Sequence, residues 1–197
     1  MASTTACFDA ARRRGLILGS LALAGFAHGQ SADAAALAAL RRGGCVAAFR
    51  HANAPGTFDP PGFRLDRCET QRNLDDRGRE QSRRLGAWFR AQGLAPTAVR
   101  SSPWCRCLET ARLAFGDDAV HAWDALGSPR AEGHDAQRQQ AELRAALARV
   151  PAGRFEVWVS HQFTLSALVG GGTASAEGLL LRANDGRVEL VGRIAPA

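Results

Sequence analysis

The chain has 197 residues, of which 46% are hydrophobic and 22% are charged. This length suffices for one domain with its own core and is too short for two ordinary domains plus linkers. All 25 basic residues are arginine and the formal net charge is +6, but the arginines are scattered, which argues against a basic stripe that binds nucleic acid. Arginine matches phosphate bidentately, so the composition has two interpretations, an anionic ligand and an Ala- and Arg-rich coding bias.

Residues 1–29 have the pattern of a signal peptide. Arg12–Arg14 precede an apolar run from Gly15 to Ala27, and small residues flank a cut before Gln30. The apolar run is too short to span a bilayer as a helix, so we expect the mature domain, residues 30–197, to be exported to the periplasm without a membrane span. The paired arginines also resemble a twin-arginine signal. A buried N-terminal helix is the alternative interpretation.

Helix and strand patterns alternate along the mature chain. Apolar residues at helical spacing predict helices over 34–42, 76–92, 103–115, 136–150 and 164–169. Short apolar or alternating runs predict strands over 45–50, 98–101, 120–123, 155–160, 178–182 and 187–191. A hairpin turn at Asn184-Asp185-Gly186 joins the last two strands. This order predicts a three-layer α/β/α sandwich with a mainly parallel sheet and an antiparallel C-terminal edge.

Removal of the signal peptide would also remove Cys7 and leave an even number of cysteines. The remaining four are Cys45, Cys68, Cys105 and Cys107. Disulfides persist in an oxidising compartment, and Cys105 and Cys107 are too close in a helical turn to bridge each other. We therefore expect Cys68 to pair with Cys105 or Cys107, and four free, buried cysteines are the alternative.

Three strand-to-helix junctions carry side chains suited to phosphate chemistry. They are Arg50-His51 after the first strand, Arg106 after the second and His161 after strand 155–160. The carboxyl ends of parallel strands meet at one edge of a sheet, where α/β folds bind ligands. Arg106 falls in the opening turn of its helix, so its guanidinium and the helix N-terminus can both face an anion. A single histidine at a strand end is, however, more often a structural hydrogen-bonding group.

Four local motifs strengthen the chemical interpretation. They are Phe49–Ala52, Asn73–Gln81, Ser101–Arg106 followed by Thr110-Ala111, and Ser160-His161. In this order they resemble the motifs of the histidine phosphatase, or phosphoglycerate mutase-like, superfamily across nearly the whole mature chain. The resemblance implies that His51 is a nucleophile that carries the phosphoryl group as phosphohistidine, and that Arg50, Arg106 and the second catalytic histidine, His161, bind the phosphate.

The resemblance implies a phosphatase that hydrolyses a phosphate monoester without a metal or other cofactor. His51 must be neutral to attack, whereas a protonated His161 would help the arginines neutralise the phosphate oxygens. The long loop from Asn53 to Cys68 resembles that of exported members related to lipopolysaccharide-core phosphate phosphatases, which implies a small-molecule or glycolipid phosphate ester as the partner. No oligomeric state follows from it.

At the position of the general acid, this sequence differs from the family pattern. Many members use a Glu some way after the second arginine, or an Asp directly after the second histidine, where this chain has Gln162. Asp124 and Glu132 remain as candidates, and Glu132 is the one we name, although a solvated surface charge explains either residue equally well.

Three other functions compete with a phosphatase. A zinc hydrolase would use the His and Cys residues, but the chain has no His-x-x-x-His or Cys-x-x-Cys spacing. A nucleic-acid binder would need aromatic platforms on a basic stripe. The strongest alternative is a non-catalytic or phosphotransferring protein that binds phosphorylated ligands on the same scaffold.

Overall fold

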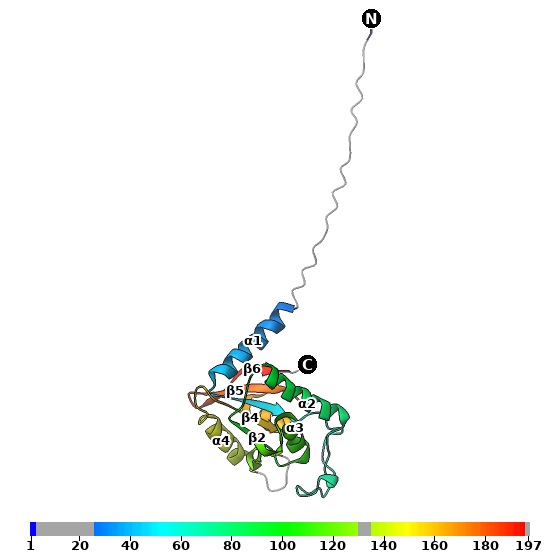
Figure 1. Cartoon of the computed structure of the whole chain (residues 1–197), viewed down its shortest axis with the longest axis vertical. Helices are drawn as coiled ribbons and strands as arrows, with labels where there is room; N and C mark the ends of the chain where they lie inside the picture. Colours follow the sequence, from blue (N-terminus) through cyan, green and yellow to red (C-terminus); the bar gives the residue numbers. More distant parts are fainter. Residues whose placement is uncertain (3–25, 130–134, 196–197) are drawn as a thin grey trace.

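A computed structural model describes residues 1–2, 26–129 and 135–195 of the chain (Figure 1). Its α-helices are α1 (Phe26–Arg42), α2 (Asp76–Ala91), α3 (Cys105–Phe115), α4 (Ala136–Leu147) and α5 (Gln162–Val169). Its strands are β1 (Cys45–Arg50), β2 (Ala98–Ser101), β3 (Val120–Ala122), β4 (Phe155–Ser160), β5 (Gly178–Asn184) and β6 (Arg187–Ile194). Most of the predicted signal peptide, residues 3–25, lies outside the described residues. None of the helices in the described ranges is long and apolar enough to cross a membrane.

The strands form one sheet in the order β3-β2-β4-β1-β5-β6. The first four are parallel, whereas β5 runs antiparallel to β1 and β6 antiparallel to β5. Asp185 and Gly186 both have positive φ in the turn between the last two strands, as a tight hairpin turn requires. The predicted mainly parallel sheet with an antiparallel C-terminal edge is therefore confirmed.

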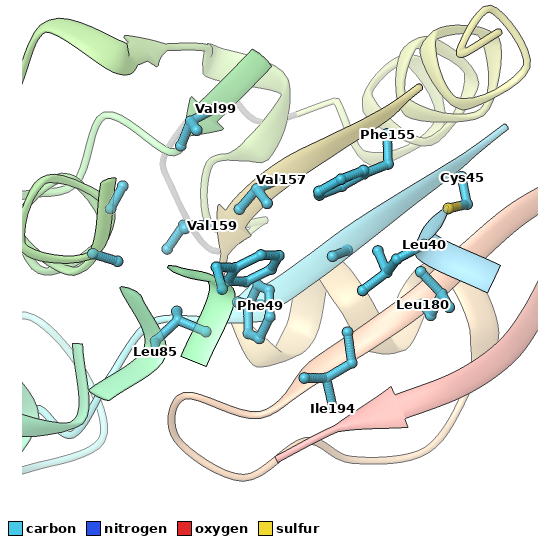
Figure 2. Packing of buried hydrophobic residues seen from close by; sticks show 14 of the residues in the cluster. Leu40, Cys45, Phe49, Leu85, Val99, Phe155, Val157, Val159, Leu180 and Ile194 are labelled. Carbon is cyan, nitrogen blue, oxygen red and sulfur yellow. The ribbon is translucent and has the colours of Figure 1, made fainter. Parts of the chain in front are cut away.

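Helices cover both faces of this sheet. Alternate residues of β1 point to opposite faces, so Cys45, Ala47 and Phe49 join a core cluster with α1, α2 and α3, whereas Val46 and Ala48 join a second cluster with α4 and α5. Figure 2 shows the first cluster, to which α1 contributes Leu40 and α2 contributes Leu85. The two clusters give the predicted three layers.

The helix boundaries differ from the predicted ones in two informative places. Helix α1 begins at Phe26, eight residues before its predicted start. Helix α3 begins at Cys105, two residues after the predicted Pro103, because Trp104 is extended and acts as the N-cap. The Trp104 side chain instead lines a cavity at the carboxyl edge of the sheet.

Candidate functional site

The carboxyl ends of β1, β2 and β4 meet at one edge of the sheet. Their register places Arg50 beside Ser160, and Ser101 beside Val159. The residues that follow β1 and β4 are His51 and His161, whose ring centroids lie 5.6 Å apart. A cavity of about 260 Å³ opens here, and its lining includes Arg50, His51, Asp59, Arg72, Arg106 and His161. The structure thus brings together Arg50, His51, Arg106 and His161, although 110 residues separate the two histidines in sequence.

The hydrogen bonding of His51 fixes its tautomer. Its Nδ1 lies 2.8 Å from the carbonyl oxygen of Ala52, and because a carbonyl can only accept, Nδ1 carries the proton. Burial, together with the positive charges of Arg106, Arg72 and Arg50, lowers the pKa of His51 to about 3. The ring is therefore neutral at physiological pH, and Nε2 carries a lone pair that is available for attack.

His161 is also neutral in the ligand-free site. Its Nδ1 accepts from the Arg106 guanidinium at 3.3 Å, which leaves Nε2 as the protonated nitrogen, 2.8 Å from the hydroxyl of Ser102. Burial, with the charge of Arg106, lowers the pKa of His161 well below its usual value. The protonated His161 expected from the sequence therefore does not describe the free site. A bound dianion would raise this pKa because it favours the charged ring.

Three arginine side chains line the cavity, and each has an unused donor. The Nε atoms of Arg50, Arg72 and Arg106 are buried and have no hydrogen-bond partner within the described part of the chain. Burial lowers the pKa of Arg50, and burial together with the charges of Arg106 and Arg50 lowers that of Arg72. Buried unpaired donors of like charge are costly, so the cavity is suited to an anion with several acceptor oxygens.

Arg72 was missed by the sequence analysis. It is one of 25 basic residues and stands in a loop just before the second motif, where nothing local distinguishes it. Its Nη1 donates to the carbonyl oxygens of Ala54 and Gly56, the latter at 3.0 Å. The side chain thus supports the start of the loop and also lines the cavity.

Asp59 was also missed, and it is the only carboxylate among the described residues that line the cavity. Its two oxygens accept from Nη1 and Nη2 of Arg106 at 2.7 and 3.2 Å. The backbone N–H of Arg72 and the indole N–H of Trp104 also donate to it. Burial alone would raise the pKa of Asp59, but these hydrogen bonds and the charge of Arg106 outweigh burial and lower it. Asp59 is therefore ionised and is the counter-ion of Arg106 in the free site.

The second sequence motif supports the segment that follows His51. Asp75 caps α2 through the N–H of Gly78 and accepts from the side chain of Asn53. Gln81 accepts from the backbone N–H of Asn53. A Cβ on Gly78 would lie 2.1 Å from the Asn53 carbonyl oxygen, so glycine permits the close approach. These residues hold the chain that positions His51 and do not touch the cavity.

The long loop is tied to α3 by a disulfide between Cys68 and Cys105. This is one of the two predicted pairings, and the other candidate, Cys107, is free and buried beside His161. Burial raises the pKa of the Cys107 thiol to about 12, so it stays protonated. The N–H of Cys105 donates to Gln71 at 3.0 Å, which reduces the contribution of the α3 N-terminus to anion binding expected from the sequence.

Of the two predicted general-acid candidates, only Asp124 lies within the described residues. Asp124 lies in the 3-10 turn Asp124–Leu126, where it is exposed and does not line the cavity. Glu132 lies outside the described residues. Gln162, which directly follows His161, does line the cavity.

The buried neutral histidines predict a stability that falls with acidity. The unfolded chain protonates His51 near pH 6.5, whereas the folded chain does so only near pH 3. Between these values the unfolded state binds more protons, so we expect His51 alone to lower the free energy of unfolding by about 1.4 kcal/mol per pH unit as the pH falls. Urea unfolding at pH 7, 6 and 5 measures this slope.

Two variants isolate the origin of this slope. His51→Gln removes one buried titrating group and should flatten the pH dependence, whereas His121→Gln changes an exposed histidine and should leave it unaltered. A slope in His51→Gln as steep as in the wild type would contradict the assignment.

A comparison with protein-family models gives a match to part of the chain. The model of the histidine phosphatase superfamily (branch 1) matches residues 65–127. This range contains the second and third motifs and excludes His51 and His161. Among curated proteins no significant sequence match is found.

Solved structures share the fold at low sequence identity. A protein described as the phosphohistidine phosphatase SixA from Agrobacterium tumefaciens is 21% identical with a TM-score of 0.53, over 77% of this chain and 98% of that one. A protein described as an alpha-ribazole-5'-P phosphatase from Escherichia coli is 16% identical with a TM-score of 0.56, over 78% and 97%. A phosphoserine phosphatase mutant from Entamoeba histolytica is 13% identical with a TM-score of 0.55, over 76% and 95%.

Proposed function

We propose that this chain is a member of the histidine phosphatase superfamily, whose model matches residues 65–127, and that it hydrolyses phosphate monoesters through a phosphohistidine on Nε2 of His51. One observation carries the proposal. A neutral, buried His51 with an unprotonated Nε2 lines a cavity together with three arginines, each of which has a buried Nε without a partner among the described residues. Such a cavity neutralises a phosphate group and holds it within reach of a nucleophile.

The first chemical step forms one bond and breaks another. Nε2 of His51 attacks phosphorus in line while the bond between phosphorus and the leaving oxygen breaks, and the leaving oxygen takes up a proton from solvent. The guanidiniums of Arg50, Arg72 and Arg106 stabilise the equatorial oxygens. The imidazole becomes a phosphorylated ring whose Nδ1–H still donates to the carbonyl oxygen of Ala52. Water then attacks phosphorus, which releases inorganic phosphate and restores neutral His51.

Substrate binding must also change the partner of Arg106. Asp59 occupies both Nη atoms of that guanidinium in the free site, so a phosphate dianion competes with this carboxylate. We expect the dianion to draw a proton onto His161, because a negative charge nearby stabilises the imidazolium.

Hydrolysis of 4-nitrophenyl phosphate with and without EDTA tests the proposed activity. We expect phosphate release that the chelator leaves unchanged, because guanidiniums supply the positive charge in this mechanism. Loss of activity in EDTA that zinc restores would instead assign a metal hydrolase. Binding of phosphate without turnover would assign the non-catalytic alternative.

We also propose that the domain is exported to the periplasm and acts there on a small-molecule or glycolipid phosphate ester. The signal pattern of residues 1–29 and the Cys68–Cys105 disulfide support this location, since disulfides persist in oxidising compartments. We expect the periplasmic protein to begin at Gln30, with Cys68 and Cys105 protected from thiol reagents after unfolding and Cys45 and Cys107 reactive.

Reduction should then destabilise the exported protein. The disulfide joins residues 37 apart in sequence, and the chain-entropy model values such a crosslink at roughly 3–4 kcal/mol. Urea unfolding with and without reductant measures the loss, and the double variant Cys68→Ser/Cys105→Ser should show no response to reductant. Free Cys68 and Cys105 in the periplasmic protein would contradict the proposal.

A further inference from the structure

Three phenylalanine side chains line the same cavity as the histidines and arginines. Phe58 and Phe63 come from the loop after His51, and Phe163 comes from the first turn of α5. Phe58 is 60% exposed and Phe163 is 41% exposed, which makes them two of the few large apolar side chains left open to solvent in the described part of the chain. Phe63 packs on Trp104, with 6.0 Å between ring centroids.

The cavity therefore has two chemically different parts. The inner part holds the ionisable groups, of which His51 and Arg106 are each only 3% exposed. The open part holds the exposed phenylalanines together with the neutral polar side chains of Thr57 and Gln162. A cavity of about 260 Å³ exceeds what a phosphate group alone fills, since four oxygens of water size occupy about 120 Å³. The remaining space adjoins aromatic surface.

We propose that Phe58, Phe63 and Phe163 form a subsite for the organic group of the phosphate ester and select substrates in which that group is a ring with an apolar face. This inference rests on the proposed function, which places the phosphate among the arginines and so fixes which part of the ester meets the phenylalanines. Aromatic side chains bind flat apolar faces through contact area and ring stacking. Aryl rings and sugar rings both offer such a face.

Substrates without a ring provide the contrast. The ionisable groups that line the cavity in the described ranges are three arginines, Asp59 and the two histidines, which are neutral in the free site. In the proposed function these groups serve the phosphate end of the ester. O-phosphoserine and glycerol phosphate offer the phenylalanines no ring, so we expect them to be poor substrates compared with ring-bearing esters.

Binding of two phosphonates separates the subsite from the catalytic step. Phenylphosphonate and methylphosphonate both present the anion, and only the first presents a ring. By titration calorimetry we expect the wild type to prefer phenylphosphonate, and Phe58→Ala/Phe163→Ala to lose about tenfold in affinity for it, the size expected for lost aromatic contact, while methylphosphonate binding stays within about twofold. Leu190→Ala is the matched control, because Leu190 is 39% exposed on β6 and does not line the cavity.

The outcomes are distinct from those of the activity test. Equal affinity of the wild type for the two phosphonates, or an equal loss of both in the double variant, would overturn the subsite and leave the phosphatase proposal standing. A wild type that binds neither phosphonate and hydrolyses no ester would instead overturn the proposed function. Glucose 6-phosphate, tested as an additional ligand, distinguishes the ring class: binding that weakens in the same variant indicates a sugar, and binding unaffected by it indicates an aryl group.

Discussion

His51→Ala is expected to lower kcat for phosphate ester hydrolysis by roughly four orders of magnitude or more. The proposed reaction passes through a bond between Nε2 of His51 and phosphorus, and removal of a nucleophile that acts as a unit with its site removes most of the catalysis. His161 is close, with its ring centroid 5.6 Å away, but its Nδ1 accepts from Arg106 and its Nε2 is bonded to Ser102. It therefore has no free lone pair to offer in place of His51.

The matched control is His121→Ala, which changes an exposed histidine on β3 that does not line the cavity. We expect its kcat and KM to equal those of the wild type. Phosphate binding should survive in His51→Ala, because Arg50, Arg72 and Arg106 remain. Wild-type turnover by His51→Ala would refute the covalent route.

Asp59→Asn is expected to destabilise the ligand-free protein by on the order of 3 kcal/mol. The side chains of Asp59 and Arg106 are only 9% and 4% exposed, and their shortest contact is 2.7 Å. Neutralising one partner of a buried ion pair leaves the other charge uncompensated, which costs more than the pair itself contributes. Urea unfolding without phosphate measures the loss.

Phosphate should reverse this loss. Asp59 and a phosphate dianion share the Nη atoms of Arg106, so the variant gains a counter-ion on binding phosphate, whereas the wild type must displace one. We expect the difference in unfolding free energy between variant and wild type to shrink as phosphate is added, and inorganic phosphate to bind the variant more tightly. A difference that is independent of phosphate would show that Asp59 lies outside the anion site.

Asp66→Asn is the control within the same loop. Asp66 pairs with Arg64, but the two side chains are 64% and 58% exposed, and solvent screens such pairs. We expect Asp66→Asn to leave both stability and phosphate affinity unchanged within error. The comparison therefore separates loss of a buried ion pair from a general effect of charge in the loop.

The sequence predicts those parts of the site that the sheet itself positions. Arg50, His51 and His161 stand at the ends of β1 and β4, whose register follows from buried apolar runs, and the strand-to-helix order places these ends at one edge. The position of Arg106 follows because it lies in the first turn of the helix after β2. The hydrophobic pattern determines the sheet, and the sheet determines where these four side chains meet.

Asp59 and Arg72 could not be found in this way, because they reach the cavity through an irregular loop. Their placement depends on contacts across the fold: the pair between Asp59 and Arg106, the bonds from Arg72 to Ala54 and Gly56, and the Cys68–Cys105 disulfide. No periodicity encodes such contacts. The same reason explains why Asp124 seemed a candidate acid: charge and sequence position selected it, and its exposure excludes it from the cavity.

Trapping of the covalent intermediate tests the central claim most directly. Phosphohistidine survives alkaline quenching, so rapid mixing with a phosphate ester, an alkaline quench and peptide mass spectrometry can locate the phosphoryl group. The account predicts a phosphoryl adduct on His51 during turnover, attached to Nε2 and absent from His51→Ala. An adduct on another residue, or steady turnover without any adduct on His51 at the earliest quench times, would contradict it.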